Sequence, residues 1–145
     1  MSITTIVKTL ITALQAGDME MAASIMSDDF LISGLTPRPL NKGEFLAFQS
    51  ELLGAMPDFS YNLDQVQQQG NEATALIQIT GTHTGNLSLP LFGLRSIQPT
   101  GIAIVQPQVS CEFQVDASKV VGVRVEQVPG GGLSGLLQQI GAELP

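Results

Sequence analysis

Cysteine and histidine are nearly absent from this sequence, which has one of each among its 145 residues, Cys111 and His83. A single cysteine cannot form a disulfide within the chain, and no Cys/His spacing typical of a zinc site is present. Because there is only one histidine, no Ser–His–Asp or Cys–His arrangement stands out. The sequence therefore predicts neither a disulfide framework nor a metal site.

Basic residues are also scarce. Six Lys and Arg stand against thirteen Asp and Glu, for a net charge of −7, and the six are scattered singly. Without a basic stripe we expect no nucleic-acid or anionic-membrane surface. No stretch approaches about 18 uninterrupted apolar residues. The first residues lack the basic start, apolar run and cleavage site of a signal peptide. We therefore expect a cytoplasmic protein with no membrane contact.

What the chain does contain is enough apolar material for one globular core. Hydrophobic residues make up 43% of the sequence. This length and composition suit a single domain over residues 1–145, and no repeat or linker divides it.

The first part of the chain has helical periodicity. Apolar residues recur at helical spacing over residues 3–14, and Gly17 follows where a helix would end. Asp18 can cap a second short helix over residues 19–26. The short run 28–34 carries large apolar residues and is predicted to be the first strand.

A third helix is predicted from a cap at each end. Asn41 and Glu44 have the spacing of a capping box, and Pro57 with Asp58 ends the apolar helical pattern.

Beyond this point the period changes to two. Residues 59–63 and 74–80 alternate around a Gly-Asn turn, and residues 102–115 and 120–128 pair across a second turn. A short apolar helix at 133–140 follows. Helices first and a meander of strands afterwards predict an α+β fold, with helices on one face of a curved antiparallel sheet.

The middle of the chain is unusually poor in charge. From Ala73 to Cys111 the only Asp, Glu, Lys or Arg is Arg95. Antiparallel sheets normally expose one polar face. This pattern favours a sheet covered on both faces, by helices or a pocket on one side and by a second subunit on the other. The alternative is an exposed face rich in Thr and Gln.

Five short motifs in a fixed order carry a family resemblance. They are Pro57-Asp58, Gly70-Asn71, Gly81-Thr82-His83, Pro99-Thr100-Gly101 and Leu136 to Gly141. From about residue 35 to the C-terminus the chain resembles the SnoaL-like polyketide cyclases of the nuclear transport factor 2-like superfamily. The resemblance implies a cystatin-like, cone-shaped barrel around an apolar pocket, and a homodimer formed through the outer sheet face.

The resemblance also implies a chemistry that this sequence does not fully match. The founding cyclases close a ring by aldol condensation, with an acidic side chain near the end of the last long strand and no cofactor. Here Gly122 stands where the family often has Glu, Arg124 where it has Trp, and Val128 near its Asp. Glu126 is the nearest substitute for the missing carboxylate, which leaves cyclase activity in doubt.

Four further positions are candidates for ligand contacts. His83 shares strand parity with buried residues, so it is either a general base or hydrogen-bond donor in the pocket, or a satisfied polar residue. Arg124 and Glu126 share a strand face, either as a charged pair in the pocket or on a solvated outer face. Arg95 either binds an anionic group at the mouth or lies on the surface. Tyr61 is the fourth candidate for a ligand contact.

Three hypotheses follow from these residues. The first is a protein that binds a small hydrophobic molecule in its pocket without catalysis. The second is a cofactor-independent cyclase or isomerase that uses Glu126 or His83 as acid/base. The third is a homodimeric interaction module whose cone is filled by side chains.

Overall fold

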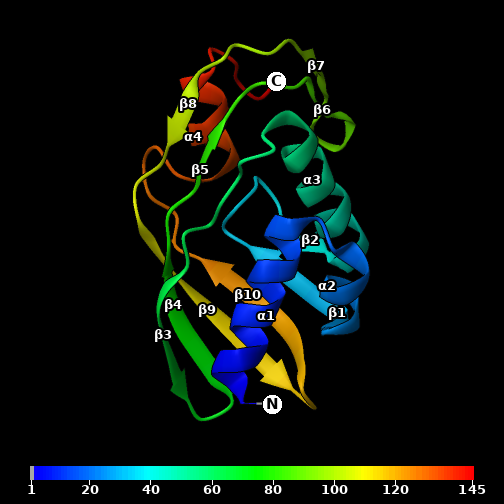
Figure 1. The fold of residues 1–145 in the computed structure, drawn as a ribbon, viewed down its shortest axis with the longest axis vertical. Coiled ribbons are helices and arrows are strands. Elements are labelled where there is room, and N and C mark those ends of the chain that lie inside the picture. Colours follow the sequence, from blue (N-terminus) through cyan, green and yellow to red (C-terminus); the bar gives the residue numbers. More distant parts are fainter. Residues whose placement is uncertain (1) are drawn as a thin grey trace.

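The structure, a computed structural model, describes residues 2–145 (Figure 1). Helices come first, strands dominate the middle, and one helix ends the chain. The elements are α1 (Ile3–Ala16), α2 (Met19–Ser24), β1 (Met26–Ser33), β2 (Leu40–Asn41), α3 (Lys42–Ala55), β3 (Asp64–Gln69), β4 (Glu72–Ile77), β5 (Thr80–Thr82), β6 (Leu87–Leu89), β7 (Leu94–Ile97), β8 (Ala103–Val105), β9 (Val109–Asp116), β10 (Lys119–Val125) and α4 (Gly132–Gln139).

Three predicted helix caps are confirmed by local contacts, whereas the second helix ends at Ser24 and not at residue 26. Gly17 ends α1 with a φ of +76°, a left-handed conformation that glycine adopts without strain. Asp18 accepts a hydrogen bond from the backbone of Met21 and caps α2. The capping box is complete: the Asn41 side chain accepts from the Glu44 N–H at 2.9 Å, and the Glu44 carboxylate accepts from the Asn41 N–H at 3.0 Å.

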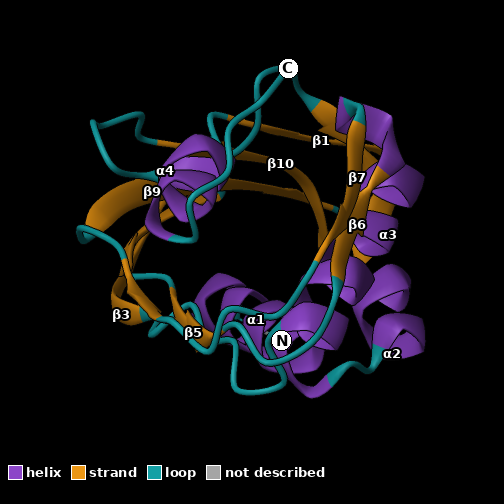
Figure 2. Cartoon of the chain, turned by 90° about the horizontal axis from the view of Figure 1, so that it is seen from above, coloured by secondary structure: helices purple, strands orange, loops and turns teal. Residues whose placement is uncertain are grey.

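The strands form a curved sheet in the order β2-β1-β10-β9-β4-β3. β1 runs parallel to β10 and the other neighbours are antiparallel, so the sheet is mixed. Two small pairs, β5 with β8 and β6 with β7, extend the upper part of the molecule. The predicted α+β, cystatin-like architecture is confirmed, although the sheet curves without closing (Figure 2).

Several predicted strands have different bounds. The run 74–80 is divided between β4 and β5, and the run 120–128 ends at Val125 as β10. The run 59–63 contributes only an isolated bridge between Ser60 and Thr80, and the regular strand β3 begins at Asp64. The run 102–115 is two strands, β8 and β9, with Pro107 between them. Proline has no N–H to donate to a ladder, which explains the break.

The helices line the hollow of this sheet. In Figure 1, α1 lies in front of the long strands β9 and β10, α3 lies above α1, and α4 lies at the upper end near β8. Gln139 of α4 binds both the N–H and the C=O of Val105 in β8, which fixes that end. Among residues 2–145, no helix is long and apolar enough to cross a membrane.

Candidate functional site

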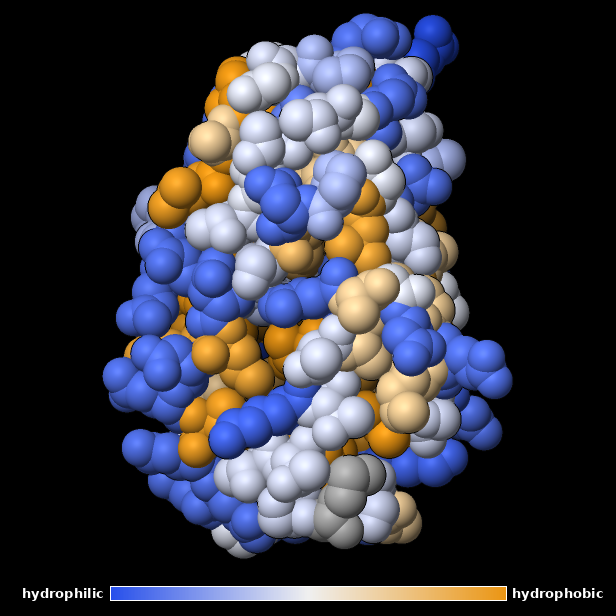
Figure 3. Space-filling model, viewed as in Figure 1, coloured by the Kyte–Doolittle hydropathy of each residue, from blue (hydrophilic) through white to orange (hydrophobic). Residues whose placement is uncertain are grey.

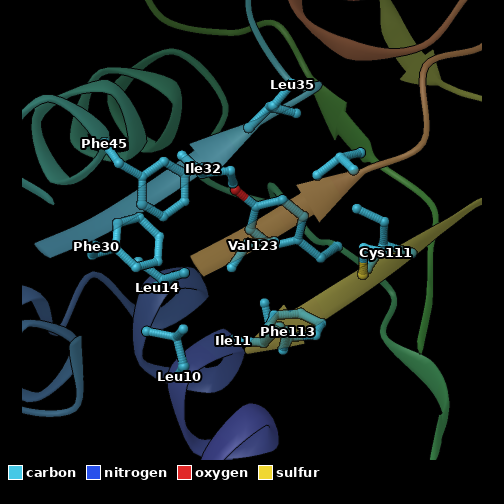
Figure 4. Close-up of a pocket in the computed structure, with 13 residues that line it drawn as sticks. Leu10, Ile11, Leu14, Phe30, Ile32, Leu35, Phe45, Cys111, Phe113 and Val123 are labelled. Carbon is cyan, nitrogen blue, oxygen red and sulfur yellow. The ribbon is translucent and has the colours of Figure 1, made fainter. Parts of the chain in front are cut away.

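A small internal cavity lies between α1, α3 and the concave face of the sheet (Figure 4). Its volume is about 20 Å³, which is room for roughly one water molecule. The thirteen residues that line it are all buried. They are Leu10, Ile11, Leu14, Phe30, Ile32, Leu35, Phe45, Tyr61, Ile77, Cys111, Phe113, Val123 and Val125.

The alternation of residues along the strands and the helical repeat of α1 both direct these side chains into the cavity. Cys111 and Phe113 alternate with exposed residues along β9, as do Val123 and Val125 around an exposed neighbour in β10. Leu10 and Leu14 lie one turn apart on α1, and Figure 4 shows them opposite the strands. The cavity thus lies where the apolar face of a helix packs against the apolar face of the sheet.

Only two of the lining side chains carry a polar atom. The Tyr61 hydroxyl donates a hydrogen bond to Oε1 of Gln49 on α3. Burial raises the pKa of Tyr61 above its ordinary value, and it raises the pKa of the Cys111 thiol to about 12. Both groups are therefore neutral at physiological pH, and none of the thirteen residues has a carboxylate or an imidazole.

Two of the lining side chains also face open clefts. Ile11 also lines a cleft of about 630 Å³ between α1 and the start of β3. Leu35 also lines a cleft of about 210 Å³ beside the loop that leads to α4. Figure 3 shows hydrophobic side chains between hydrophilic ones on the face that carries α1. A ligand larger than one water molecule therefore requires lining side chains to move.

The histidine lies outside this cavity, in a polar group that we call the His83 cluster: Asp58, Thr82, His83 and Thr100. His83 is 1% exposed. Its Nδ1 accepts from the Thr100 N–H at 3.3 Å and lies 3.0 Å from the Thr100 hydroxyl. Because Nδ1 is an acceptor, the ring proton is on Nε2, which has no hydrogen-bond partner among residues 2–145. Burial lowers the pKa of His83.

The same cluster joins three of the sequence motifs. The Asp58 carboxylate accepts from the Thr82 N–H at 2.7 Å and from the Thr82 hydroxyl at 2.8 Å. These hydrogen bonds lower the pKa of Asp58. The Gly-Thr-His and Pro-Thr-Gly motifs also exchange backbone hydrogen bonds, from the His83 N–H to Ile102 and from the Gly101 N–H to His83. The contacts of the cluster connect loops to β5.

The other candidates lie on the surface, except for Tyr61. Arg124 is exposed and its guanidinium lies 3.2 Å from the Glu112 carboxylate on the outer face of the sheet. Glu126 follows β10 and accepts from the Ser110 N–H at 3.1 Å, so it is not paired with Arg124. Arg95 is exposed on β7. Tyr61 alone of the predicted set lines the cavity.

Gln49 is a site residue that the sequence pattern did not reveal. It lies on the apolar face of α3, one turn after Phe45, and is fully buried. Its amide nitrogen has no hydrogen-bond partner among residues 2–145. The sequence signal that could have identified it is a glutamine among the phenylalanines and leucines of this helix, because a buried polar side chain needs a hydrogen-bond partner.

Comparisons with known proteins agree on the fold. A sequence model of the SnoaL-like domain matches residues 7–123. A search of the curated proteins finds no match. Among solved structures, IdmH of Streptomyces antibioticus, to which a polyketide cyclase activity is attributed, is 17% identical with a TM-score of 0.71 and covers 94% of this chain and 99% of its own.

Two further structures have similar scores. AclR of Streptomyces galilaeus, to which a hydroxylase activity is attributed, is 17% identical with a TM-score of 0.72 over 96% of this chain and 80% of its own. A Xanthomonas campestris protein of unknown function with a cystatin-like fold is 16% identical, with a TM-score of 0.65 and 97% coverage of both chains. At these identities the likeness concerns the fold alone.

Proposed function

The chain belongs to the SnoaL-like domain family, and from that premise we propose that it binds a small apolar molecule in its internal cavity without converting it. The observation that supports this most is the cavity wall. Its lining residues are apolar except for Tyr61 and Cys111, which are both neutral. Such a wall favours a ligand with an apolar surface, and it offers no group that exchanges a proton near neutral pH.

The position of the missing carboxylate supports binding over catalysis. The family resemblance places an Asp near Val128, and Val128 lines the cleft that shares Leu35 with the cavity. The position that the family uses for its carboxylate therefore carries an apolar side chain here. Glu126 and His83 could act as acid/base only if they moved to the cavity, because neither is among its lining residues. Their catalytic role stays a prediction that this geometry does not favour.

The small volume supports a second candidate, an interaction module. A space of about 20 Å³ leaves the cone nearly filled by side chains. The outer face of the sheet would then be the functional surface, and the predicted homodimer would use it. Against this, the Arg124–Glu112 pair on that face is compatible with solvent exposure in a monomer.

Titration with a neutral fluorescent probe tests the proposal. N-phenylnaphthylamine brightens in an apolar environment, so its fluorescence should rise and saturate with the wild-type protein. Val123→Ile adds one methyl group inside the cavity and should weaken binding about tenfold. Val121→Ile makes the same change in the same strand at a half-buried residue outside the lining and should not.

Three outcomes are informative. Weaker binding by Val123→Ile alone supports the internal site. Equal binding by both variants would move the probe to another surface. A wild-type protein that does not bind the probe at all would overturn the proposal and favour the interaction module.

A further inference from the structure

The cleft between α1 and the chain that leads into β3 is a second place for a ligand, and we call it the α1–β3 cleft. Its volume of about 630 Å³ falls within the range of small-molecule sites. Ten residues line it, and Ile11 is the only one that it shares with the internal cavity. The residues that could recognise a ligand here are therefore a different set from those of the cavity.

The wall opposite α1 is held in an irregular conformation. Asn62 and Gln65 have φ values of +47° and +51°, in the left-handed region that most residues avoid. The Asn62 side-chain amide donates to the Gln78 carbonyl at 2.8 Å, and Asp64 Oδ1 accepts from the Gln65 N–H at 2.9 Å. The register of β3 against β4 shifts between Asp64 and Gln67. Strained residues persist where contacts fix them, and they gather at ligand sites.

Hydrogen-bond donors from α1 form the facing wall. Lys8, Thr12 and Gln15 line the cleft, and their spacing places them on one face of the helix. Gln15 Oε1 accepts from the Tyr61 N–H at 2.7 Å, which orients the amide. Its half-buried Nε2 has no hydrogen-bond acceptor among residues 2–145 and remains a donor for a ligand. An ammonium, a hydroxyl and an amide N–H together suit a carboxylate.

The wall formed by the chain before β3 carries the opposite charge. Asp64 is the only acidic residue of the lining and Lys8 the only basic one, and within residues 2–145 neither forms a salt bridge. The lining also has three buried or half-buried apolar side chains, Ile11, Leu63 and Val66. A simple anion would meet the Asp64 carboxylate as well as Lys8. A molecule with both charges and an apolar part matches all three features.

We propose that the α1–β3 cleft binds a small zwitterion with an apolar side chain, of the class of the apolar α-amino acids. The ligand carboxylate accepts hydrogen bonds from the donors of α1, its ammonium group pairs with Asp64, and its side chain covers Ile11 and Leu63. This inference goes beyond the proposed function, because it assigns a ligand of different chemistry to a different place.

Three related probes test this assignment by chemical-shift titration of the isotope-labelled protein. Leucine carries both charges, N-acetylleucine lacks the ammonium group, and leucinamide lacks the carboxylate. We expect leucine to cause saturable shifts at the amides of residues 8–15 and 60–66. Each analogue should bind about fivefold more weakly, because each loses one charged contact at a solvent-exposed site.

Exposed variants link each charge of the probe to one residue. Lys8→Met should weaken leucine binding about fivefold and leave leucinamide unchanged, because leucinamide has no carboxylate to lose. Asp64→Asn should weaken leucine binding and leave N-acetylleucine unchanged or stronger. Lys119→Met removes an exposed lysine at the start of β10, outside the lining, and should leave leucine binding unchanged.

Several results would overturn the proposal. They are no saturable shift with leucine, equal affinity for leucine and either analogue, and wild-type leucine affinity in Lys8→Met or Asp64→Asn. An equal loss in Lys119→Met would mean that net charge and not the cleft explains the effect. Shifts confined to β9 and β10 would place leucine in the cavity instead. Because N-phenylnaphthylamine tests the cavity separately, either proposal can fail without the other.

Discussion

The internal cavity and the His83 cluster lie within one fold but are held together by different forces. Apolar side chains from α1, α3 and the sheet close the cavity, and its two polar side chains stay neutral. The His83 cluster is built from hydrogen bonds, with Asp58 on Thr82 and Thr100 on His83. The carboxylate and the imidazole are thus found where loops are fastened, and none of the residues that line the cavity carries either group.

This difference between the cavity and the His83 cluster indicates which of the two regions has the functional site. A lone histidine in a conspicuous motif suggests chemistry, yet its contacts here connect β5 to the loop at Thr100. The cavity carries no motif at all, because its residues come from seven separate segments of the chain. We therefore propose that ligands bind in the cavity and that the contacts of the His83 cluster are structural.

The largest expected effect is the loss of a cavity wall. Phe113 is a large, fully buried side chain of β9, so Phe113→Ala should lower the free energy of unfolding by about 3–5 kcal/mol. Urea denaturation measures this loss. A reduction below about 1 kcal/mol would mean that the interior is loosely packed, and the contrast with the His83 cluster would disappear.

The next effect concerns the reactivity of the cavity thiol. Burial raises the pKa of Cys111 from 9.0 to about 12. Near pH 8 its thiolate fraction, and so its reaction with an aromatic disulfide reagent, should be about a thousandfold lower in the folded than in the urea-unfolded protein. Absorbance of the released thiolate measures both rates. Comparable rates in the two states would place Cys111 in contact with solvent.

The His83 cluster should show a smaller effect with its own pH dependence. His83→Gln removes the acceptor of the Thr100 N–H and should cost about 1–2 kcal/mol. Burial lowers the folded-state pKa of His83, so the unfolded state binds more protons once pH falls below about 6.5. Wild-type stability should therefore decline from pH 7 toward pH 5, and the decline should be shallower in the variant. Parallel curves would contradict a neutral, buried His83.

The smallest effect is expected on the outer face of the sheet. Arg124 and Glu112 form a solvent-exposed pair, so Arg124→Ala should change the free energy of unfolding by less than about 0.5 kcal/mol. A larger loss that grows with protein concentration would instead place Arg124 in a covered interface, as the predicted homodimer requires. Sedimentation velocity of both proteins identifies that case.

Local signals in the sequence predicted much of the fold. Gly17, Asp18 and the Asn41–Glu44 box act within one helical turn, so the helix ends could be read directly. The strand bounds were less accurate. The run 59–63 looked like a strand because its apolar residues alternate, but it pairs only through Ser60, while its buried side chains belong to the core.

The candidate site was harder to predict, because it depends on packing between distant segments. Strand alternation left both faces of β10 open, and the structure puts Val123 and Val125 on the cavity and Arg124 outside. Tyr61, which was predicted to contact a ligand, lines the cavity, and its contact with a ligand stays a prediction. No local pattern predicts the cavity volume or the pairing of Gln49 with Tyr61, which joins α3 to a segment beyond it.

Amide chemical shifts recorded during titration with N-phenylnaphthylamine test the central assignment most directly. If the ligand binds in the cavity, the largest changes should fall on the strand segments around Cys111, Phe113 and Val123, whose side chains line it. The amides of His83 and Thr100 should change little. The opposite pattern, with the largest changes at His83 and Thr100 and none at the cavity strands, would contradict the account.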